Sequence, residues 1–235
     1  MDKQKTSKKA WVWLPILLII FFVSSFIAIG QPPREYPAFL SHSPSPTGVK
    51  ALYTYLDEEL EAVKRWTHSP DMLTTVGGDQ VLVMIEPSFI PSSAEMNEYE
   101  EFMAAGNTIM LFSENPAGMF GLRYDPLTYL PEDEPIHSKN EEFYADFRSP
   151  IRLVASEEDE ILLEDDQGVI AFKRQVGDGY LMVINEAGWL VNQYILDEDH
   201  IPLILFLLDE AESASVLFDD YVHGAENATS MLSTY

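Results

Sequence analysis

The chain has 235 residues, of which 46% are apolar and 12% aromatic, and it contains no cysteine. This apolar content is enough to build a packed core, which excludes a disordered protein. The lack of cysteine excludes disulfides, thiolate metal sites and cysteine nucleophiles. The five histidines form no HExxH motif or other close pair, so we expect neither a metal nor a cofactor.

Charge is distributed unevenly along the chain. Lys3, Lys5, Lys8 and Lys9 lie among the first nine residues, whereas residues 31–235 hold 38 of the 39 acidic side chains and a formal charge of −28. A surface this negative repels nucleic acid, so we expect no nucleic-acid partner. The acidity indicates solubility rather than a specific cation-binding role.

An uncharged stretch, AWVWLPILLIIFFVSSFIAIG, occupies residues 10–30. As a helix it spans roughly 31 Å at about 1.5 Å per residue, which is enough to cross a bilayer. The preceding lysines favour a cytoplasmic N-terminus and an extracytoplasmic remainder. We therefore predict a basic cytoplasmic tail (1–9) and a single-pass anchor (10–30) in the lipid bilayer of the cell membrane. A cleaved signal peptide stays open, because AIG at residues 28–30 fits a cleavage site.

The remainder divides into a Pro-rich spacer (31–37), an exterior domain (38–224) and a polar tail (225–235). Residues 36–42 are predicted as a first short strand. A helix is predicted to follow, with Ser45 as its N-cap and Pro46 in its first position.

The central part of the exterior domain shows strand, helix and strand in turn. Two strands are predicted, a brief one at 62–67 and a buried one in the continuous apolar run at 80–86. Ser92 and Glu95 match a capping box that opens a helix ending near Gly106, and residues 107–113 are the next buried strand. This order is typical of a parallel sheet covered by helices on both faces.

The pattern changes after residue 113. Residues 114–148, rich in Pro, Gly, Tyr and acids, indicate a long excursion. Four strand-like segments follow between residues 151 and 185, and the turn GDG at residues 177–179 predicts a hairpin, hence an antiparallel extension. A buried helix at 201–208 and a final strand at 215–220 complete the domain.

Three segments together resemble the bacterial domain of unknown function 4350 family: SPSPTGVKALYTYLDE, the EPS and PSSAEMNEYEEFMAAGNTIMLFS unit, and VLFDDYVHG. The resemblance covers most of residues 30–224, with Val222 in place of the first His of the family's acidic-Tyr-His-His-Gly ending. It implies a flavodoxin-like fold of the class I glutamine-amidotransferase type. It also implies a membrane-protein partner linked to a MoxR-type AAA ATPase system. Longer members continue into further membrane helices, so this chain is either a short variant or truncated.

Amidotransferases use a cysteine in a glycine-flanked elbow, and this chain has none. Ser113, which ends a predicted strand, is the nearest substitute, with His137 or His200 as its base. The alternative is a serine that caps a turn.

Helix N-termini and strand ends meet at the carboxyl edge of a parallel sheet, where ligands bind. The segment from Ser43 to Gly48 is interpreted either as an anion site or, preferably, as a clean helix cap. The candidate ligand-binding residues are Ser43, Ser45, Thr47, Gly48, Glu86, Ser113, Asp219, Asp220 and His223.

We therefore predict a membrane-anchored, non-catalytic α/β domain that acts as an interaction or ligand-sensing module, with residues 114–148 as its contact region. Two alternatives stay open. One is a divergent hydrolase that uses Ser113 or carboxylates such as Glu86 and Asp219. The other is an accessory subunit of an envelope transport or assembly system.

Overall fold

The structure, a computed structural model, describes residues 8–29, 36–73, 78–129 and 135–224. Most of the predicted basic tail and spacer, and all of the C-terminal tail, lie outside the described residues. By their internal contacts the residues form two units, Met1–Glu35 and Tyr36–Tyr235.

The helix α1, Lys8–Ile29, belongs to the first unit and contains Pro15. Large apolar side chains between Trp13 and Val23 are exposed. Among the residues that the structure describes, no helix combines the length and the apolar character needed to cross a membrane. The transmembrane anchor predicted over residues 10–30 is thus not supported.

The central part of the second unit has strand, helix and strand in turn, as predicted. β2, Gln80–Ile85, is followed by α3, Ser93–Ala104, and by β3, Thr108–Phe112. Ser92 and Glu95 form the predicted capping box, in which the Ser92 side chain accepts from the Glu95 N–H and the Glu95 carboxylate accepts from the Ser92 N–H. Gly106, which follows the helix, has a φ of +96°, a conformation that favours glycine.

One mixed sheet runs through this unit, with strand order β1-β11-β2-β3-β10-β9-β8-β5-β6 in the described residues. The first five strands are parallel and include β1 (Val63–Trp66), β11 (Ser215–Asp219) and β10 (Gly179–Ile184). From β10 onward the pairing is antiparallel, as the GDG turn predicted. The antiparallel strands are β4 (Tyr124–Pro126), β5 (Ile136–His137), β6 (Glu142–Phe143), β7 (Ile151–Leu153), β8 (Glu160–Asp165) and β9 (Gly168–Val176).

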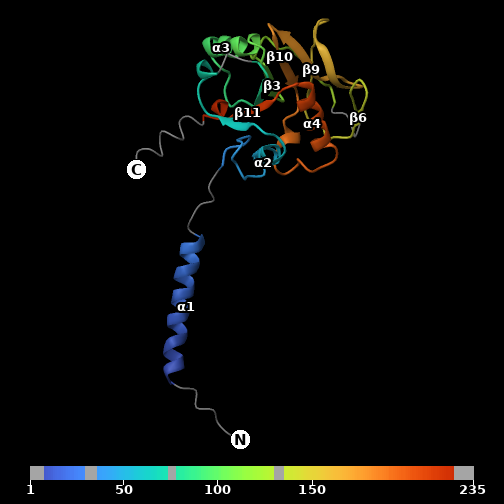
Figure 1. Ribbon diagram of the computed structural model, residues 1–235. Coiled ribbons are helices and arrows are strands. Elements are labelled where there is room, and N and C mark those ends of the chain that lie inside the picture. Colours follow the sequence, from blue (N-terminus) through green and yellow to red (C-terminus); the bar gives the residue numbers. More distant parts are fainter. Residues whose placement is uncertain (1–7, 30–35, 74–77, 130–134, 225–235) are drawn as a thin grey trace. The chain divides into compact units, whose positions relative to one another are not determined.

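Helices cover both faces of the parallel strands, with α3 on one side and α2, Lys50–Glu59, and α4, His200–Glu210, on the other (Figure 1). Successive residues of β2 alternate between two cores. Val81 and Val83 belong to the core of α2 and α4, whereas Leu82 and Met84 belong to the core of α3. Short 3-10 turns occupy Pro70–Met72, Gly188–Leu190 and Tyr221–His223.

The first strand predicted, at residues 36–42, does not form. Its backbone is used in turns instead: the Phe39 N–H donates to the Thr47 carbonyl at 2.8 Å, and the Ser43 N–H donates to the Leu40 carbonyl at 3.1 Å. The Ser41 N–H donates to the Asp220 carboxylate at 3.0 Å. Because these backbone N–H groups are already hydrogen-bonded, the segment cannot form the hydrogen-bond ladder of a β-strand with a neighbouring strand.

The predicted N-cap at Ser45 is also wrong, because α2 begins at Lys50 and Val49 occupies the cap position. A distant residue supplies the cap. The Asn192 side chain accepts the Ala51 N–H at 2.8 Å and donates to the carbonyls of Ser43 and Ser45 at 2.9 and 2.6 Å. Tertiary contacts have thus replaced the local cap.

Candidate functional site

Acidic residues follow adjacent strands at the carboxyl edge of the parallel sheet. Glu86 follows β2 directly, and Glu114 and Glu186 each lie two residues beyond the ends of β3 and β10. Because β2, β3 and β10 are neighbours in the sheet, their ends bring these three acids to one edge. This row of carboxylates is the starting point for a site.

Glu186 is the most deeply buried of the three, with 2% of its surface exposed. Its carboxylate accepts the backbone N–H groups of Arg148 at 2.7 Å, Ser149 at 3.1 Å and Gly188 at 2.8 Å. Burial raises its pKa to about 7, although the three N–H donors act in the opposite direction, and the charge of Glu114 adds to the rise. Glu186 therefore changes its charge near neutral pH.

A cavity of about 150 Å³ lies against Glu186. Glu186, Val191 and His200 form a buried floor, whereas the polar residues of the rim, including Glu114 and Arg148, are exposed. Segments far apart in sequence therefore meet here. The lining residues are Phe39, Thr47, Glu114, Asp146, Arg148, Glu186, Gly188, Val191, Gln193, Tyr194 and His200.

His200, the first residue of α4, lines this cavity and has one ring nitrogen without a hydrogen-bond partner among the described residues. Its Nδ1 lies 2.7 Å from the Tyr194 carbonyl oxygen, which can only accept, so Nδ1 carries a proton and donates. The other ring nitrogen, Nε2, is an acceptor whenever the ring is neutral, and it is buried without a hydrogen-bond partner. A buried acceptor without a partner is costly unless a ligand or water satisfies it.

Arg148 sits on the rim with its charge already paired. Its Nε donates to the Asp146 carboxylate at 2.8 Å, and the two side chains form an ion pair. The guanidinium also lies over the Tyr194 ring, 4.6 Å from the ring centre, and donates to the Tyr194 hydroxyl at 3.2 Å. Arg148 therefore shapes the rim without offsetting the charges of Glu114 and Glu186.

A family model described as "domain of unknown function (DUF4350)" matches residues 41–208. The chain belongs to the DUF4350 family. The match includes every residue that lines the Glu186 cavity except Phe39. No curated protein matches the chain in sequence.

Solved structures resemble the DUF4350 chain only weakly. The chain is 11% identical to Gan42B, a GH42 beta-galactosidase from G. stearothermophilus, covering 63% of this chain and 23% of that one, with a TM-score of 0.39. It is 12% identical to exo-beta-1,4-mannosidase Op5Man5 from Opitutaceae bacterium strain TAV5, covering 72% of this chain and 40% of that one, with a TM-score of 0.41. It is 10% identical to the cytoplasmic protein STM1381 from Salmonella typhimurium LT2, covering 63% of this chain and 77% of that one, with a TM-score of 0.41. The chain spans less than half of either glycosidase, and no argument rests on similarities this weak.

Ser113 and Glu86 lie beside the cavity of the DUF4350 domain. Burial raises the pKa of Glu86, an effect opposed by hydrogen bonds from the Glu114 N–H and the Ser113 hydroxyl. The Ser113 Oγ also accepts the Asn115 N–H at 3.3 Å. Among the described residues, no histidine hydrogen-bonds Ser113, and His137 lies in the antiparallel extension. The turn-capping interpretation of Ser113 therefore fits its contacts.

Asp219 and Asp220, two predicted ligand residues, are both buried and engaged in holding the fold. Asp219 accepts from the Tyr99 hydroxyl at 2.8 Å and the Tyr221 N–H at 3.1 Å, and burial raises its pKa to about 7. Asp220 accepts from the Ser41 hydroxyl at 2.7 Å. Both carboxylates thus tie the end of β11 to neighbouring segments.

Asp220 also has a histidine neighbour, and His223 is held close by. The His42 Nδ1 lies 3.6 Å from the Asp220 carboxylate. The His223 Nδ1 lies 3.0 Å from the Ser88 hydroxyl, and burial lowers the pKa of His223. These contacts connect the β2 and β11 ends of the sheet edge.

The predicted anion segment from Ser43 to Gly48 forms a chain of hydroxyls. The Ser43 and Ser45 hydroxyls are 2.8 Å apart, and those of Ser45 and Thr47 are 3.4 Å apart. A Cβ on Gly48 would lie 2.2 Å from the Ser43 carbonyl oxygen, so this position requires glycine. Of these four residues, only Thr47 lines the Glu186 cavity.

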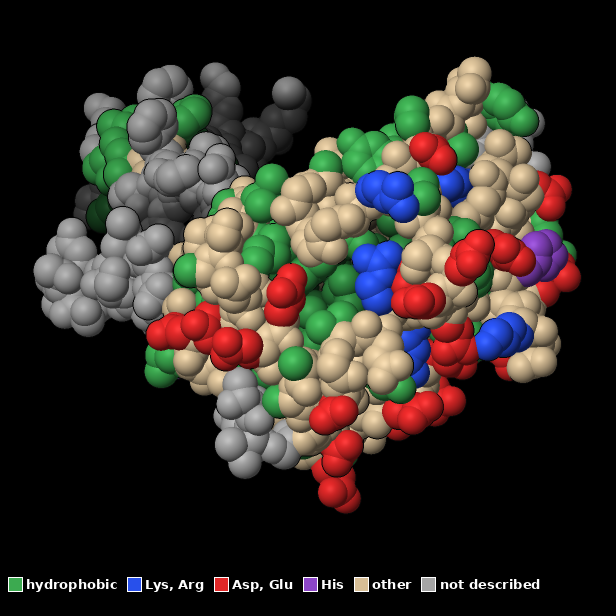
Figure 2. All heavy atoms as spheres, turned by 90° about the horizontal axis from the view of Figure 1, so that it is seen from above, with side chains coloured by type: hydrophobic (Ala, Val, Ile, Leu, Met, Phe, Trp, Pro, Cys, Tyr) green, Lys and Arg blue, Asp and Glu red, His purple; other side chains and the backbone are tan. Residues whose placement is uncertain are grey.

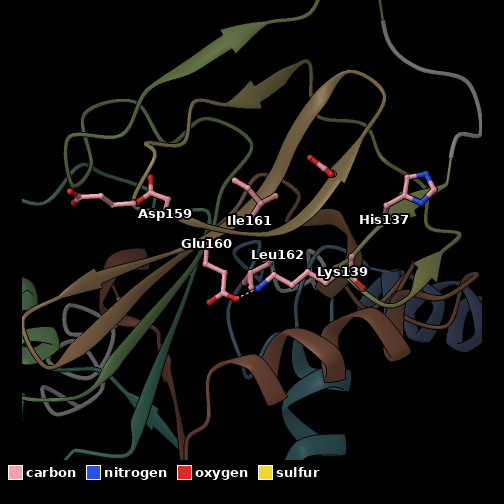
Figure 3. Close-up of a pocket in the computed structure, with 9 residues that line it drawn as sticks. His137, Lys139, Asp159, Glu160, Ile161 and Leu162 are labelled. Atoms are coloured by element: carbon pink, nitrogen blue, oxygen red, sulfur yellow. Dashed lines mark hydrogen bonds and ion pairs between the residues drawn. The ribbon is translucent and has the colours of Figure 1, made fainter.

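A larger hollow, of about 530 Å³, lies on the antiparallel extension between β8 and the β5–β6 region. In Figure 3, Lys139 pairs with Glu160, while His137 and Asp159 lie on opposite sides of the hollow. Asp159 is itself bonded to Arg174 at 2.7 Å. The labelled charges here already have partners, so the larger hollow is the weaker candidate.

The face of the molecule drawn in Figure 2 shows no separate basic patch. Figure 2 shows acidic side chains spread over one face, with Lys and Arg side chains lying among them rather than in a separate patch. Within ranges 8–29, 36–73, 78–129 and 135–224, no group of three or more His, Asp or Glu side chains is placed to hold a metal ion.

Sequence reasoning did not select Glu186, and it considered His200 only as a base for Ser113. A signal for Glu186 was available, because it follows an apolar strand just as Glu86 does. The neighbouring sequence gave no signal for the role of His200, because the burial of its unpaired nitrogen depends on residues far away in the sequence.

Proposed function

We propose that residues 38–224 act as a non-catalytic ligand-sensing module that binds a small polar ligand in the Glu186 cavity. One observation carries the proposal: Glu186, whose carboxylate is buried, and His200, whose Nε2 is buried without a hydrogen-bond partner, line the same cavity. The Glu186 carboxylate already accepts three backbone N–H groups, so a ligand gains most by hydrogen-bonding the His200 Nε2, which removes the cost of leaving this nitrogen unsatisfied.

A non-catalytic role is favoured by the contacts of Ser113, which bonds to Glu86 and the Asn115 N–H and not to a histidine base. The finer fold assignment, a flavodoxin-like domain of the glutamine-amidotransferase type, is part of the same proposal. Five parallel strands with helices on both faces support it. In such folds the carboxyl edge is the place where ligands bind.

A thermal-shift screen of the full-length chain tests the proposal, using panels of small amines, polyols and carboxylates. A ligand present at 100 times its dissociation constant stabilises a protein by about 2.7 kcal/mol. For a domain of this size, that corresponds to a rise in Tm of roughly 5–10 °C. We expect such a rise with at least one compound, and its loss in Glu186→Gln.

Glu100→Gln is the matched control, because it removes an exposed acid on α3. This variant should respond to the ligand as the unchanged protein does. If no compound in any panel raises the Tm, or if the shift survives in Glu186→Gln, the proposed ligand site is wrong.

A hydrolase that uses carboxylates is the second candidate, and the Glu186 carboxylate favours it. A general acid or base works best when its pKa lies near the working pH, and burial raises that of Glu186 to about 7. Turnover of ester, amide or glycoside substrates that falls at least a hundredfold in Glu186→Gln would establish this candidate in place of a sensor.

We further propose that the module works at the cell membrane with a membrane-protein partner, linked to a MoxR-type AAA ATPase system or to envelope transport or assembly. The uncharged sequence of residues 10–30 and the family resemblance support this. Carbonate extraction of native membranes tests the location, and crosslinked pull-down of the full-length chain tests the partner. Release of the protein by carbonate would contradict an anchor.

A further inference from the structure

We infer that the ligand of the Glu186 cavity is a small organic cation carrying an ammonium group. The inference rests on the proposed function, because it names the class of ligand for the same site. It follows from the charges, the hydrogen-bonding groups and the shape of the cavity.

The cavity carries uncompensated negative charge. Among the described residues, neither Glu114 nor Glu186 forms an ion pair, and the basic residue that lines the cavity, Arg148, is paired with Asp146. Glu114 is close enough to Glu186 for its charge to act on that carboxylate. A ligand cation placed between the two acids would be attracted by both, and most strongly at the buried one.

The cavity lining also includes hydrogen-bond acceptors. The His200 Nδ1–H donates to the Tyr194 carbonyl, and the other ring nitrogen, Nε2, which is an acceptor when the ring is neutral, has no partner. When ionised, the Glu186 carboxylate can only accept hydrogen bonds, and three backbone N–H groups hold it in place. An ammonium group carries three donors and no acceptor, which matches this set.

The remaining walls suit a short carbon chain rather than a bare ion. Phe39, Val191 and Tyr194 line the cavity, and aromatic faces attract cations. A volume of about 150 Å³ is several times the roughly 30 Å³ that one water occupies in the liquid. A ligand carboxylate would meet the negative charges of Glu114 and Asp146, so we expect an amine without one.

Binding should depend on pH through Glu186. The titratable or charged groups around it at the cavity are Glu114, Asp146, Arg148, Tyr194 and His200. Because burial raises the pKa of Glu186 to about 7, this carboxylate is mostly neutral at pH 6 and mostly ionised at pH 8. Ammonium binding should therefore be weaker at pH 6 and should release a proton there.

Isothermal titration of the full-length chain at pH 8 tests the inference with 1,4-diaminobutane and its neutral match, 1,4-butanediol. We expect the diamine to bind at least tenfold more tightly than the diol. Glu186→Gln should weaken diamine binding at least tenfold. Glu114→Gln on the exposed rim, where folding is not at risk, should weaken it severalfold, while Glu100→Gln should leave it unchanged.

Each other outcome overturns the inference in a recognisable way. Binding of the diol or of succinate that depends on Glu186 would refute the ammonium class but leave the proposed ligand site intact. Tighter binding of magnesium or calcium chloride than of the diamine would identify a metal site instead. If neither these probes nor any compound of the thermal-shift panels binds, both the inference and the proposed function fail.

Discussion

The parallel and antiparallel parts of the sheet both carry a hollow, and the smaller one is the better site. The hollow of about 530 Å³ on the antiparallel extension is lined by the ion pair of Lys139 with Glu160 and by Asp159, which is bonded to Arg174. The cavity of about 150 Å³ at the parallel edge is lined by Glu186, which forms no ion pair among the described residues, and by His200, whose Nε2 has no hydrogen-bond partner. The state of the polar groups therefore identifies a site better than its volume does.

Topology accounts for this difference. Parallel strands all end at the same edge, so acids that follow β2, β3 and β10 gather there. In the antiparallel extension, neighbouring segments bring opposite charges together, as Asp159 with Arg174 and Asp165 with Arg152 show. Charged side chains thus stabilise the fold of the antiparallel extension. At the parallel edge, as proposed above, they are available to a ligand.

The largest expected effect concerns the buried pair of the extension. Arg152 and Asp165 side chains are 4% and 3% exposed, and the Arg152 Nε donates to Asp165 at 2.9 Å. Asp165→Ala leaves a buried guanidinium without its partner, so we expect a loss of about 3–5 kcal/mol in the free energy of unfolding. Urea denaturation of the full-length chain measures it. A loss below 1 kcal/mol would contradict the comparison of the two parts of the sheet, because the buried ion pair would then not stabilise the antiparallel extension.

The next effect concerns Glu186 and pH. Its pKa is raised from 4.5 to about 7 in the folded state, so the stabilisation belongs to the protonated form. It is fully present below pH 4.5 and is lost as the pH rises through about 7. At about 1.4 kcal/mol per pKa unit, the protein should lose about 3 kcal/mol between pH 4 and pH 8 relative to Glu186→Gln.

Urea denaturation of both proteins across this pH range gives the difference directly. Asp219, whose pKa is also raised to about 7, titrates in both and cancels. If the difference in the free energy of unfolding between the two proteins stays constant with pH, the pKa of Glu186 is not raised by burial. Glu186 would then no longer contrast with the paired charges of the antiparallel extension.

A smaller effect is expected at Asn192, which joins two segments of the cavity wall. Asn192→Ala removes the acceptor of the Ala51 N–H and the donor to the Ser43 and Ser45 carbonyls. The loss of a helix cap predicts a decrease of about 1–2 kcal/mol in the free energy of unfolding. Asn192→Asp, which keeps the acceptor, should recover part of this. Equal losses in both variants would show that the cap is not the stabilising contact.

The smallest effect is expected at the pair that lines the larger hollow. Lys139 and Glu160 side chains are 66% and 43% exposed, and exposed ion pairs contribute little. Glu160→Gln should leave the denaturation midpoint unchanged. A clear destabilisation would mean that this pair, like the buried one, supports the extension.

Features set by neighbouring residues were predictable. The capping box of Ser92 and Glu95 forms as expected, because its partners are three residues apart. The GDG turn at residues 177–179 joins β9 and β10, because its glycines suit a tight turn. The buried strands at residues 80–86 and 107–113 also form, because continuous apolar runs of this length are buried on both faces.

Features set by distant residues were not predictable from the sequence. The start of α2 depends on Asn192, which follows it by more than 130 residues, so the local Ser-Pro signal at residues 45–46 was misleading. Asp219 and Asp220 were correctly placed at the sheet edge, but sequence alone did not show that Tyr99 and Ser41 engage them.

The motifs of the sequence carried the resemblance to the DUF4350 family, which the family model confirms. The sequence by itself also determined the mixed α/β class and the acids that follow the parallel strands, because apolar periodicity and strand ends are local properties of the chain. Only the tertiary structure decided which of those acids stay unpaired. Whether a buried carboxylate or imidazole finds a partner depends on segments far apart in sequence. The His200 Nε2 and Glu186 became a candidate site only when five such segments closed around them.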